Sequence, residues 1–382
     1  MNSDSNSRAR QPYRICSRCV MDTSDEGIVF DHDGVCSNCS GYLSRTQSRR
    51  YVAGDSERMW ESYVDVIKKN GIGSQYDCIA GVSGGVDSSY AVYLCRKYNL
   101  RTLLVHLDNG WDSQVSVENI RILASSLGFD YTSVVIDWEE FREIQIGFLR
   151  AFTVDFEMPT DIAIHAAILQ TARKHGVRYI VSGGNLTSEG MLPLTWGYHR
   201  YKDMHLYRSI VRRYSSRPLR KVPVIGLAEE AYYRFLFGMK TLYILNYHDY
   251  NKDHAKEFLQ KELGWRDYGG KHHESRITAF WHGYVMYEKF GKDYRRPTLS
   301  AQICNEQITR AEALELLKLP SYNPERVIEE KVYIAKKFKM ELSDFELLLQ
   351  SPPKCYLDFP NRKKLIDFCY GLYNKYFNAR RV

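Results

Sequence analysis

The chain has 382 residues, 44% of them hydrophobic and 26% charged, a composition typical of a globular protein with two or three domains. The sequence contains no run of 18 apolar residues, which excludes a membrane-spanning helix, and residues 1–11 lack the apolar core of a secretory signal. We therefore expect a cytoplasmic protein without a membrane span. The net charge of +7 suits an anionic nucleotide or nucleotide sugar, and RNA equally well.

Two Cys-x-x-Cys pairs mark the N-terminal segment, at 16–19 and 36–39. Residues 1–12 before them are expected to be disordered. In a cytoplasmic chain, two such pairs indicate a metal site, whereas four unpaired surface thiols are the alternative. Four thiolates complete a tetrahedral site, so we predict a structural Zn²⁺ module with a linker over 13–54. The predicted ligands are Cys16, Cys19, Cys36 and Cys39.

Apolar strands and amphipathic helices alternate from residue 55 to residue 195. The predicted helices cover 55–69, 88–98, 114–127 and 161–175, the last with Thr160 as its N-cap. The predicted strands cover 76–82, 101–107, 131–136 and 177–181. Strands separated by helix-length segments predict an α/β fold with a doubly wound parallel sheet. Residues 196–382 are expected to be a mainly helical region that binds substrate or a partner, with helices over 309–317 and 325–338.

A glycine-rich string, Ser-Gly-Gly-Val-Asp-Ser-Ser at 83–89, follows the first predicted strand and opens a helix. Small residues let backbone N–H groups approach phosphate oxygens, and the N-terminus of the helix favours negative charge. The string has no Walker-A lysine, so it is not the common P-loop. We interpret it as a phosphate-binding loop in which Asp87 holds Mg²⁺ or caps the loop. The alternative is a turn that merely joins strand to helix.

Two further turns follow predicted strands, His-Leu-Asp-Asn-Gly at 106–110 and Ser-Gly-Gly-Asn at 182–185. In a doubly wound sheet, all three turns line one crevice at the carboxyl ends of the strands. Each of these two turns also fits a plain loop, because Asp-Asn-Gly is a favourable turn sequence.

Basic residues cluster again in Lys-His-His-Glu-Ser-Arg at 271–276 and in Arg295-Arg296. Clusters of this kind suit an anionic substrate such as a diphosphate or carboxylate, and a solvated helix start is the alternative. A second metal site at His272, His273 and Glu274 is disfavoured, because adjacent histidines point in different directions on any regular element.

The loop at 83–89 resembles the pyrophosphate-binding loop of the N-type ATP-pyrophosphatases, the superfamily of GMP, NAD and asparagine synthetases and of tRNA-thiolation enzymes. The wider set of motifs resembles one family, the N-acetyl sugar amidotransferases of LPS O-antigen and nonulosonic acid biosynthesis. This resemblance covers residues 13 to about 315 and rests on the strings at 16–24, 31–39, 83–89, 106–111, 182–185 and 271–276.

The resemblance implies an adenine nucleotide alpha hydrolase-like fold over 55–195 and a use for ATP and Mg²⁺. It implies that the acetamido oxygen of a nucleotide-linked N-acetyl sugar attacks ATP, and that ammonia then displaces AMP to give an acetamidino group. The residues assigned to substrate or phosphate chemistry are Asp87, Lys271 and Arg276. The residues assigned to the nucleotide are Gly81, Val82, Ser83, Gly84, Gly85, Val86, Asp87, Ser88, Ser89, His106, Asp108, Gly183, Gly184 and Asn185.

The sequence carries no glutaminase signature, so the resemblance implies separate partners: a glutaminase and a cyclase-like subunit that conducts ammonia. The Tyr- and Arg-rich region at 197–250 is a candidate docking surface for them. A nucleic acid partner is not expected, although a tRNA-modifying thiolase or lysidine-type ligase is the alternative reading of the same loop. A nucleotide sensor without catalytic activity is a further alternative. The identity of the sugar, and whether it is UDP- or CMP-linked, stays open.

Overall fold

The computed structural model describes residues 12–49, 51–198, 203–215, 220–270 and 273–373. At its centre is a five-stranded sheet in the order β3-β2-β1-β4-β5, in which every neighbouring pair is parallel. The strands are β1 Cys78–Gly81, β2 Thr102–Asp108, β3 Asp130–Val135, β4 Tyr179–Ser182 and β5 Lys240–Tyr243. Strands β2 and β3 lie on one side of β1, and β4 and β5 on the other. The predicted doubly wound parallel sheet is confirmed, and its winding reverses between β1 and β4.

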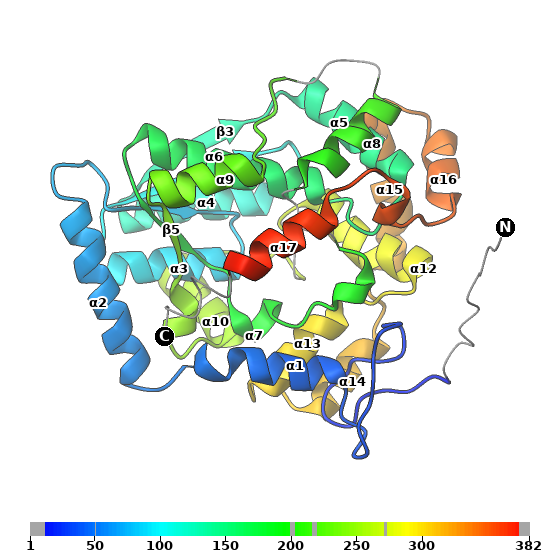
Figure 1. Cartoon of the computed structure of the whole chain (residues 1–382), viewed down its shortest axis with the longest axis horizontal. Helices are drawn as coiled ribbons and strands as arrows, with labels where there is room; N and C mark the ends of the chain where they lie inside the picture. The colour runs from blue at the N-terminus through cyan, green and yellow to red at the C-terminus, as the bar shows by residue number, and fades with distance from the viewer. Residues whose placement is uncertain (1–11, 50, 199–202, 216–219, 271–272, 374–382) are drawn as a thin grey trace.

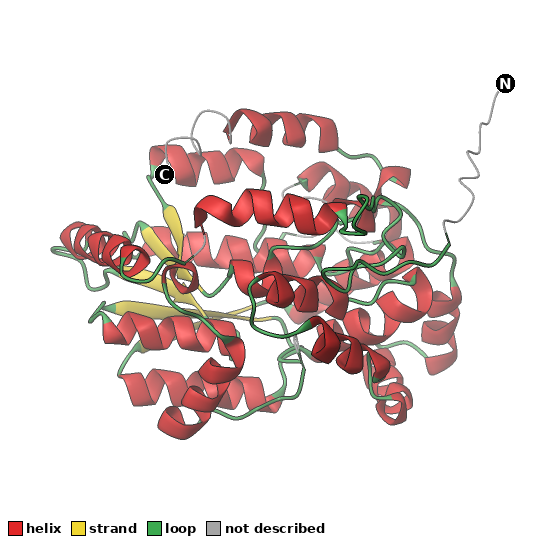
Figure 2. Cartoon of the chain, turned by 90° about the horizontal axis from the view of Figure 1, so that it is seen from below, coloured by secondary structure: helices red, strands yellow, loops and turns green. Residues whose placement is uncertain are grey.

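Helices cover both faces of the sheet, as Figure 2 shows. Successive strand residues point to opposite faces: Ala80 and Leu104 belong to one apolar core, and Ile79 and Leu103 to another. The helices of the first face are α2 Asp55–Asn70, α3 Val86–Lys97, α4 Gln114–Leu127 and α10 Lys252–Leu263. The second face is covered by α6 Met158–Lys174 and by residues 225–239.

Three elements differ from the prediction. Helix α5, Trp138–Ala151, was not predicted, and β5 lies beyond residue 195, so the sheet continues into the region expected to be helical. Helix α6 begins at Met158 with Glu157 as its N-cap, so the prediction that Thr160 caps this helix is wrong. Pro159 explains the earlier start, because proline fits the first turn of a helix.

The rest of the described chain is mainly helical; beyond residue 196 this was predicted, whereas α1 (Ser37–Thr46) forms within 13–54, where a metal module and a linker were expected. Its helices are α1 Ser37–Thr46, α7 Leu186–Glu189, α8 Met204–Tyr214, α9 Leu227–Ala231, α11 Arg276–Phe280, α12 Met286–Phe290, α13 Arg295–Cys304, α14 Arg310–Lys318, α15 Val327–Phe338, α16 Leu342–Gln350 and α17 Lys363–Tyr373. Helix α1 lies beside α13, although the two are far apart in sequence (Figure 1). None of the described helices has the length and apolar character needed to cross a membrane. The disorder expected for residues 1–12 falls almost wholly outside the described residues.

Candidate active site

The glycine loop (residues 83–89) connects β1 to α3 where the winding of the sheet reverses. Gly84 has a φ of +76°, and a Cβ at this position would lie 2.3 Å from the carbonyl oxygen of Ser116. Only glycine therefore fits there. Helix α3 begins directly after Gly85, and the N–H groups of a first helical turn have no partners within the helix. This arrangement binds anionic oxygens.

Three side chains from distant segments hold the glycine loop in place. The carbonyl oxygen of Gly84 accepts hydrogen bonds from Trp265 Nε1 at 3.0 Å and from Asn119 Nδ2 at 3.3 Å. The hydroxyl of Tyr268 accepts a hydrogen bond from the N–H of Val86 at 3.3 Å. No sequence motif identifies Trp265 or Tyr268, because both follow α10 in an irregular loop.

The carboxylate of Asp87 lies among three polar side chains. Its Oδ1 accepts hydrogen bonds from Asn185 Nδ2 at 3.2 Å and from the Tyr250 hydroxyl, and Lys252 Nζ lies 3.7 Å from Oδ2. Burial, followed by the charge of Asp87, raises the pKa of Tyr250, so this hydroxyl stays protonated and donates. The structure thus brings the predicted Asp87 and Asn185 together, and adds Tyr250 and Lys252 to the site.

The serines of the glycine loop have different environments. The Ser83 and Ser88 hydroxyls lie 3.3 Å apart, and the Ser83 hydroxyl accepts a hydrogen bond from the N–H of Gly85. Ser89 is fully buried, and its hydroxyl has no hydrogen-bond partner among the described residues. Ser83 and Ser88 are therefore better placed than Ser89 to meet a ligand.

The other predicted glycines allow close packing around the loop. A Cβ at Gly183 would lie 2.6 Å from the carbonyl oxygen of Asp87, and one at Gly184 would lie 3.2 Å from the Tyr243 ring. A Cβ at Gly81 would lie 2.8 Å from Ile168 Cδ1. The turn after β4 thus packs directly on the glycine loop, as the sheet topology predicts.

His106 and Asp108 end β2 beside the glycine loop. Buried His106 pairs through Nδ1 with the carbonyl oxygen of Val82 and through Nε2 with Asp112 Oδ2, both at 3.0 Å. Burial alone lowers the pKa of His106, but the hydrogen bond and charge of Asp112 outweigh burial and raise it. Asp108 Oδ1 accepts a hydrogen bond from the N–H of Gly110 at 2.9 Å. Both side chains have protein partners here, so a contact with nucleotide stays a prediction.

The segment at 271–276 lies beside the loop that follows β2, although Lys271 and His272 fall outside the described residues. The N–H of Ser113 donates to the carbonyl of Glu274 at 2.8 Å, and the N–H of Arg276 donates to the carbonyl of Trp111 at 2.9 Å. The Arg276 guanidinium pairs with buried Glu330 at 2.9 Å and lies over the Tyr333 ring. Arg276 therefore anchors α11 to α15, and its predicted substrate contact stays a prediction.

Four carboxylates form an acidic cluster near the carboxyl end of β4, which the sequence did not predict. Its members are Asp155, Glu157, Asp161 and Glu189. A Cβ at Gly184 would lie 3.4 Å from Glu189 Oε2, which places Glu189 beside the turn after β4. Burial, followed by the charges of all four carboxylates, raises the pKa of Tyr294, so all four lie within electrostatic range of its hydroxyl. The acidic cluster thus extends from the turn after β4 to the start of α6.

Within the acidic cluster, Glu157 is buried and has one carboxylate oxygen without a hydrogen-bond partner among the described residues. Oε2 accepts a hydrogen bond from the Thr278 hydroxyl at 3.1 Å, whereas buried Oε1 has no hydrogen-bond partner among the described residues. The Thr160 hydroxyl lies near this carboxylate without hydrogen-bond geometry. Burial and the charge of Asp161 raise the pKa of Glu157 to about 8. Burial and the charge of Glu189 raise the pKa of Asp161 to about 7, although part of its side chain is accessible.

The four predicted metal ligands converge in the cysteine module (residues 13–49). All four Sγ atoms lie within 4.8 Å of one another and are fully buried. The Cys16–Cys39 and Cys19–Cys36 Sγ separations are 3.9 and 3.7 Å, close to the ~3.8 Å spacing of tetrahedral thiolates around zinc. Backbone N–H groups donate to three of the sulfurs at 3.2–3.4 Å, which favours thiolates. The site fits a tetrahedral thiophilic metal.

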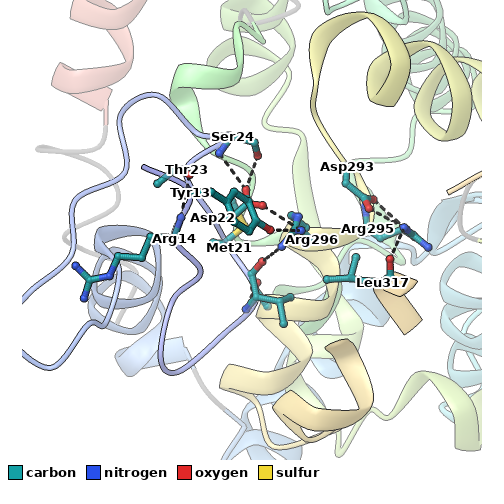
Figure 3. Close-up of polar contacts among 12 residues, drawn as sticks. Tyr13, Arg14, Met21, Asp22, Thr23, Ser24, Asp293, Arg295, Arg296 and Leu317 are labelled. Atoms are coloured by element: carbon teal, nitrogen blue, oxygen red, sulfur yellow. Dashed lines mark hydrogen bonds and ion pairs between the residues drawn. The ribbon is translucent and has the colours of Figure 1, made fainter. Parts of the chain in front are cut away.

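Two arginines of the C-terminal region clamp the cysteine module. Arg296 donates to the carbonyl of Val20 at 2.6 Å and pairs with buried Asp22 at 3.0 Å, as Figure 3 shows. Arg310 Nε donates to the carbonyls of Cys16 and Cys19, each at 3.0 Å.

The neighbouring Arg295 pairs with Asp293 at 2.7 Å and binds carbonyls at the end of α14 (Figure 3). The contact of Arg295 and Arg296 with an anionic substrate therefore stays a prediction, because both guanidiniums contact protein groups here. Both guanidiniums are engaged in packing α13 against α14 and the cysteine module.

Two family models match the chain. The asparagine synthase model matches residues 74–322, more than half of the chain. The model described as LPS biosynthesis protein WbpG-like, C-terminal domain, matches residues 274–374. No curated protein matches the chain.

Three solved structures with low similarity are an NMN synthetase, an NAD synthetase and a tRNA thiolase. NMN synthetase from Francisella tularensis is 15% identical, with a TM-score of 0.29 over 51% of this chain and 93% of that chain. The NH₃-dependent NAD synthetase from Campylobacter jejuni is 11% identical, with a TM-score of 0.31 over 78% of this chain and 98% of that chain. The U34-tRNA thiolase NcsA from Methanococcus maripaludis is 12% identical, with a TM-score of 0.30 over 80% of this chain and 88% of that chain.

The functional assignment rests on the two family models together with the glycine loop and the cysteine cluster, and not on these weak structural similarities. The chain belongs to the asparagine synthase family, and its residues 274–374 match the C-terminal domain of WbpG-like LPS biosynthesis proteins.

Proposed function

We propose that this protein is an ATP-dependent, cytoplasmic amidotransferase that converts an acetamido group of a nucleotide-linked N-acetyl sugar into an acetamidino group. One observation supports this best. The glycine loop lies where the winding of the sheet reverses, next to the segment matched by the WbpG-like model, residues 274–374. The two lie close together, because a Cβ at Gly85 would be 3.7 Å from Glu274 Oε1. The N–H of Ser113, which follows β2, also donates to the Glu274 carbonyl. The segment matched by the WbpG-like model thus lies against the glycine loop.

The glycine loop would bind the phosphates of ATP while the acetamido oxygen attacks the α-phosphorus. The new O–P bond forms, the bond from the α-phosphorus to the oxygen that bridges to the β-phosphate breaks, and pyrophosphate leaves. The amide N–H proton passes to solvent, which leaves a neutral imidoyl-adenylate. Asp87 would hold Mg²⁺, which when bound neutralises charge on the departing pyrophosphate. Lys252, 3.7 Å from Asp87, adds positive charge at the same place. Lys271 and Arg276 remain proposed contacts for the anionic substrate.

The acidic cluster would serve the second half of the reaction. Its acids suit a cationic or proton-donating ligand, and ammonium is the cationic reactant that this chemistry requires. Glu157 would take a proton from ammonium, and the nitrogen lone pair would form the new C–N bond with the activated carbon. One proton moves from the added nitrogen to the sugar nitrogen, the C–O bond to AMP breaks, and AMP leaves.

Ammonia would come from a separate glutaminase through a cyclase-like subunit. The proposed docking region at 197–250 contains α8 and α9, which line a cavity of about 1140 Å³ together with α17. The lining is largely apolar and carries charges of both signs: Arg208, Arg212, Arg234, Arg362, Asp203, Glu229 and Glu230. Such a surface suits a partner segment with apolar and charged side chains.

The purified protein, incubated with Mg-ATP, ammonium chloride and UDP- or CMP-linked N-acetyl sugars, tests the proposal. We expect AMP and pyrophosphate in equal amounts, and a sugar whose mass shows that NH has replaced O. Pyrophosphate that forms only with tRNA would instead assign the protein to RNA modification. A thiolase mechanism lacks support, because Cys78, at the start of β1, and Cys95, near the end of α3, are buried in an apolar core.

Gly84→Ala is expected to lower kcat/KM for ATP by about tenfold or more. The alanine must adopt a left-handed φ, which costs roughly 1–2 kcal/mol of conformational free energy. Its Cβ also clashes with the Ser116 carbonyl oxygen. Gly128→Ala is the matched control, because Gly128 has a φ of +65° but no atom within 4 Å of its added Cβ. Steady-state kinetics of pyrophosphate release compare the two, and equal activities would argue against a role for the loop geometry.

Cys36→Ser is expected to abolish stoichiometric zinc and to lower the melting temperature. The substitution removes one of four converging thiolates, and a segment with little core of its own depends on its metal. Cys355→Ser, at an exposed cysteine outside the module, should leave both unchanged. Metal content by mass spectrometry and thermal melts check this. Full zinc occupancy in Cys36→Ser would contradict the assigned ligand set.

A further inference from the structure

The segment that follows β4, residues 185–190, is held from one side by the cysteine module. Tyr42 on α1 is fully buried, and its hydroxyl donates to the carbonyl of Leu186 at 2.7 Å. Its ring lies against Gly190, where an added Cβ would be 2.5 Å from Tyr42 Cε2. Arg45, one turn further along α1, donates to the carbonyl of Gly190 at 3.3 Å. Two side chains of one helix thus fix both ends of α7.

The same segment holds Asp87 from its other side. Asn185 caps α7 by accepting a hydrogen bond from the N–H of Ser188 at 3.0 Å. The amide of the same side chain donates to Asp87 Oδ1 at 3.2 Å. Asn185 and Leu186 are adjacent, so a displacement of the Leu186 carbonyl shifts the amide that holds Asp87. A continuous set of contacts therefore leads from Tyr42 to the glycine loop.

The metal ligands set the position of Tyr42. Cys36 and Cys39 lie at the N-terminus of α1, and Tyr42 follows Cys39 by one turn on the same buried face. Helix α13 contacts both residues: Cys304 Sγ lies 3.9 Å from Cys39 Sγ, and Asn305 Nδ2 donates to the Tyr42 hydroxyl at 2.6 Å. The orientation of α1 thus depends on the cysteine cluster at one end and determines the Leu186 contact at the other.

We propose that Tyr42 is a positioning residue that couples the metal site to the glycine loop. The metal-loaded module holds Asn185, and through it Asp87, in the geometry that binds Mg-ATP. The proposal rests on the use of ATP at the glycine loop, as proposed above. Because coupling between two sites is reciprocal, bound Mg-ATP must also retain the metal more tightly.

Two measurements on the full-length, zinc-loaded protein test this coupling. Tyr42→Phe removes one hydroxyl and should weaken Mg-ATP binding in calorimetry about fivefold, the effect of one hydrogen bond. Zinc affinity, measured by equilibrium competition with a colorimetric chelator, should be raised by Mg-ATP in the wild type, and much less in Tyr42→Phe. Tyr13→Phe is the matched control, because this exposed tyrosine belongs to the same module but bonds Arg296 instead of the segment after β4. It should behave as the wild type in both assays.

The possible results separate this proposal from the proposed function. A wild type that does not bind Mg-ATP overturns both. Suppose instead that the wild type binds Mg-ATP. An unchanged Mg-ATP affinity in Tyr42→Phe, or a zinc affinity that Mg-ATP does not alter, then overturns only the coupling. Asn305→Leu removes the donor to the Tyr42 hydroxyl and should weaken Mg-ATP binding in the same direction. The zinc measurement on the wild type needs no variant, so it still tests the coupling if a variant fails to fold.

Discussion

Asp87→Asn is expected to lower the rate of sugar-dependent AMP formation by about a thousandfold. Asparagine keeps the size of the side chain but removes the charge that would bind Mg²⁺, and it leaves Lys252 without its carboxylate. AMP and pyrophosphate are measured at saturating sugar and ammonium, with circular dichroism to confirm the fold.

Asp267→Asn is the control for this variant. Asp267 follows α10 near the residues that support the glycine loop, but it pairs with Lys256 at 2.5 Å and not with Asp87. It should retain nearly wild-type activity. An Asp87→Asn enzyme within tenfold of the wild type would mean that Asp87 only caps the loop and holds no metal.

Glu157→Gln is expected to slow nitrogen transfer by about 10²–10⁴-fold while leaving adenylation intact, since glutamine cannot accept the proton of ammonium. Adenylation is measured as the sugar-dependent exchange of labelled pyrophosphate into ATP. Hydroxylamine, which is neutral at neutral pH and needs no proton acceptor, should restore much of the variant's activity. Loss of the exchange reaction as well would assign Glu157 to substrate binding or folding instead.

The same carboxylate predicts a pH dependence. The pKa of Glu157 is about 8, so wild-type nitrogen transfer should rise as the pH approaches 8 and the proton acceptor is freed. A carboxyl whose pKa is raised on folding stabilises the fold below its unfolded pKa of about 4.3, and this contribution is lost as pH rises through the folded value. Glutamine stays neutral, so Glu157→Gln should melt at a higher temperature than the wild type above pH 8, with little difference near pH 4. Thermal melts across this range check the sign.

The sheet was predictable where a strand-forming run lies between two helices, whether the strand is buried, as β2 is, or largely exposed at the edge, as β3 is. The run at 101–107 becomes β2, whose residues are almost all buried. β5 escaped prediction because it is a short edge strand in which only Leu242 is buried. Helix α5 escaped it because its buried residues surround the helix, with Ile144, Ile146 and Phe148 in strand-like alternation. Periodicity detects elements with one buried face, and neither of these has one.

The site was predictable where it is local in sequence. The strings at 83–89 and 182–185 identified loops that meet through Asp87 and Asn185, because parallel strands bring their carboxyl ends together. Tyr250, Lys252 and Trp265 come from segments that approach the loop only after folding, so no spacing reveals them. The acidic cluster is likewise invisible in sequence, because it combines the start of α6 with the end of α7.

The clamp on the cysteine module has a consequence for synthesis on the ribosome. Arg310 binds the carbonyl of Cys19 across 291 positions of the chain. At about 5–20 residues per second, the module therefore emerges roughly 15–60 s before the helix that secures it. During that interval the nascent segment has only its own thiolates and whatever metal they capture. Cellular zinc supply during translation should thus decide how much of the protein matures, so zinc starvation should act most strongly on newly made chains.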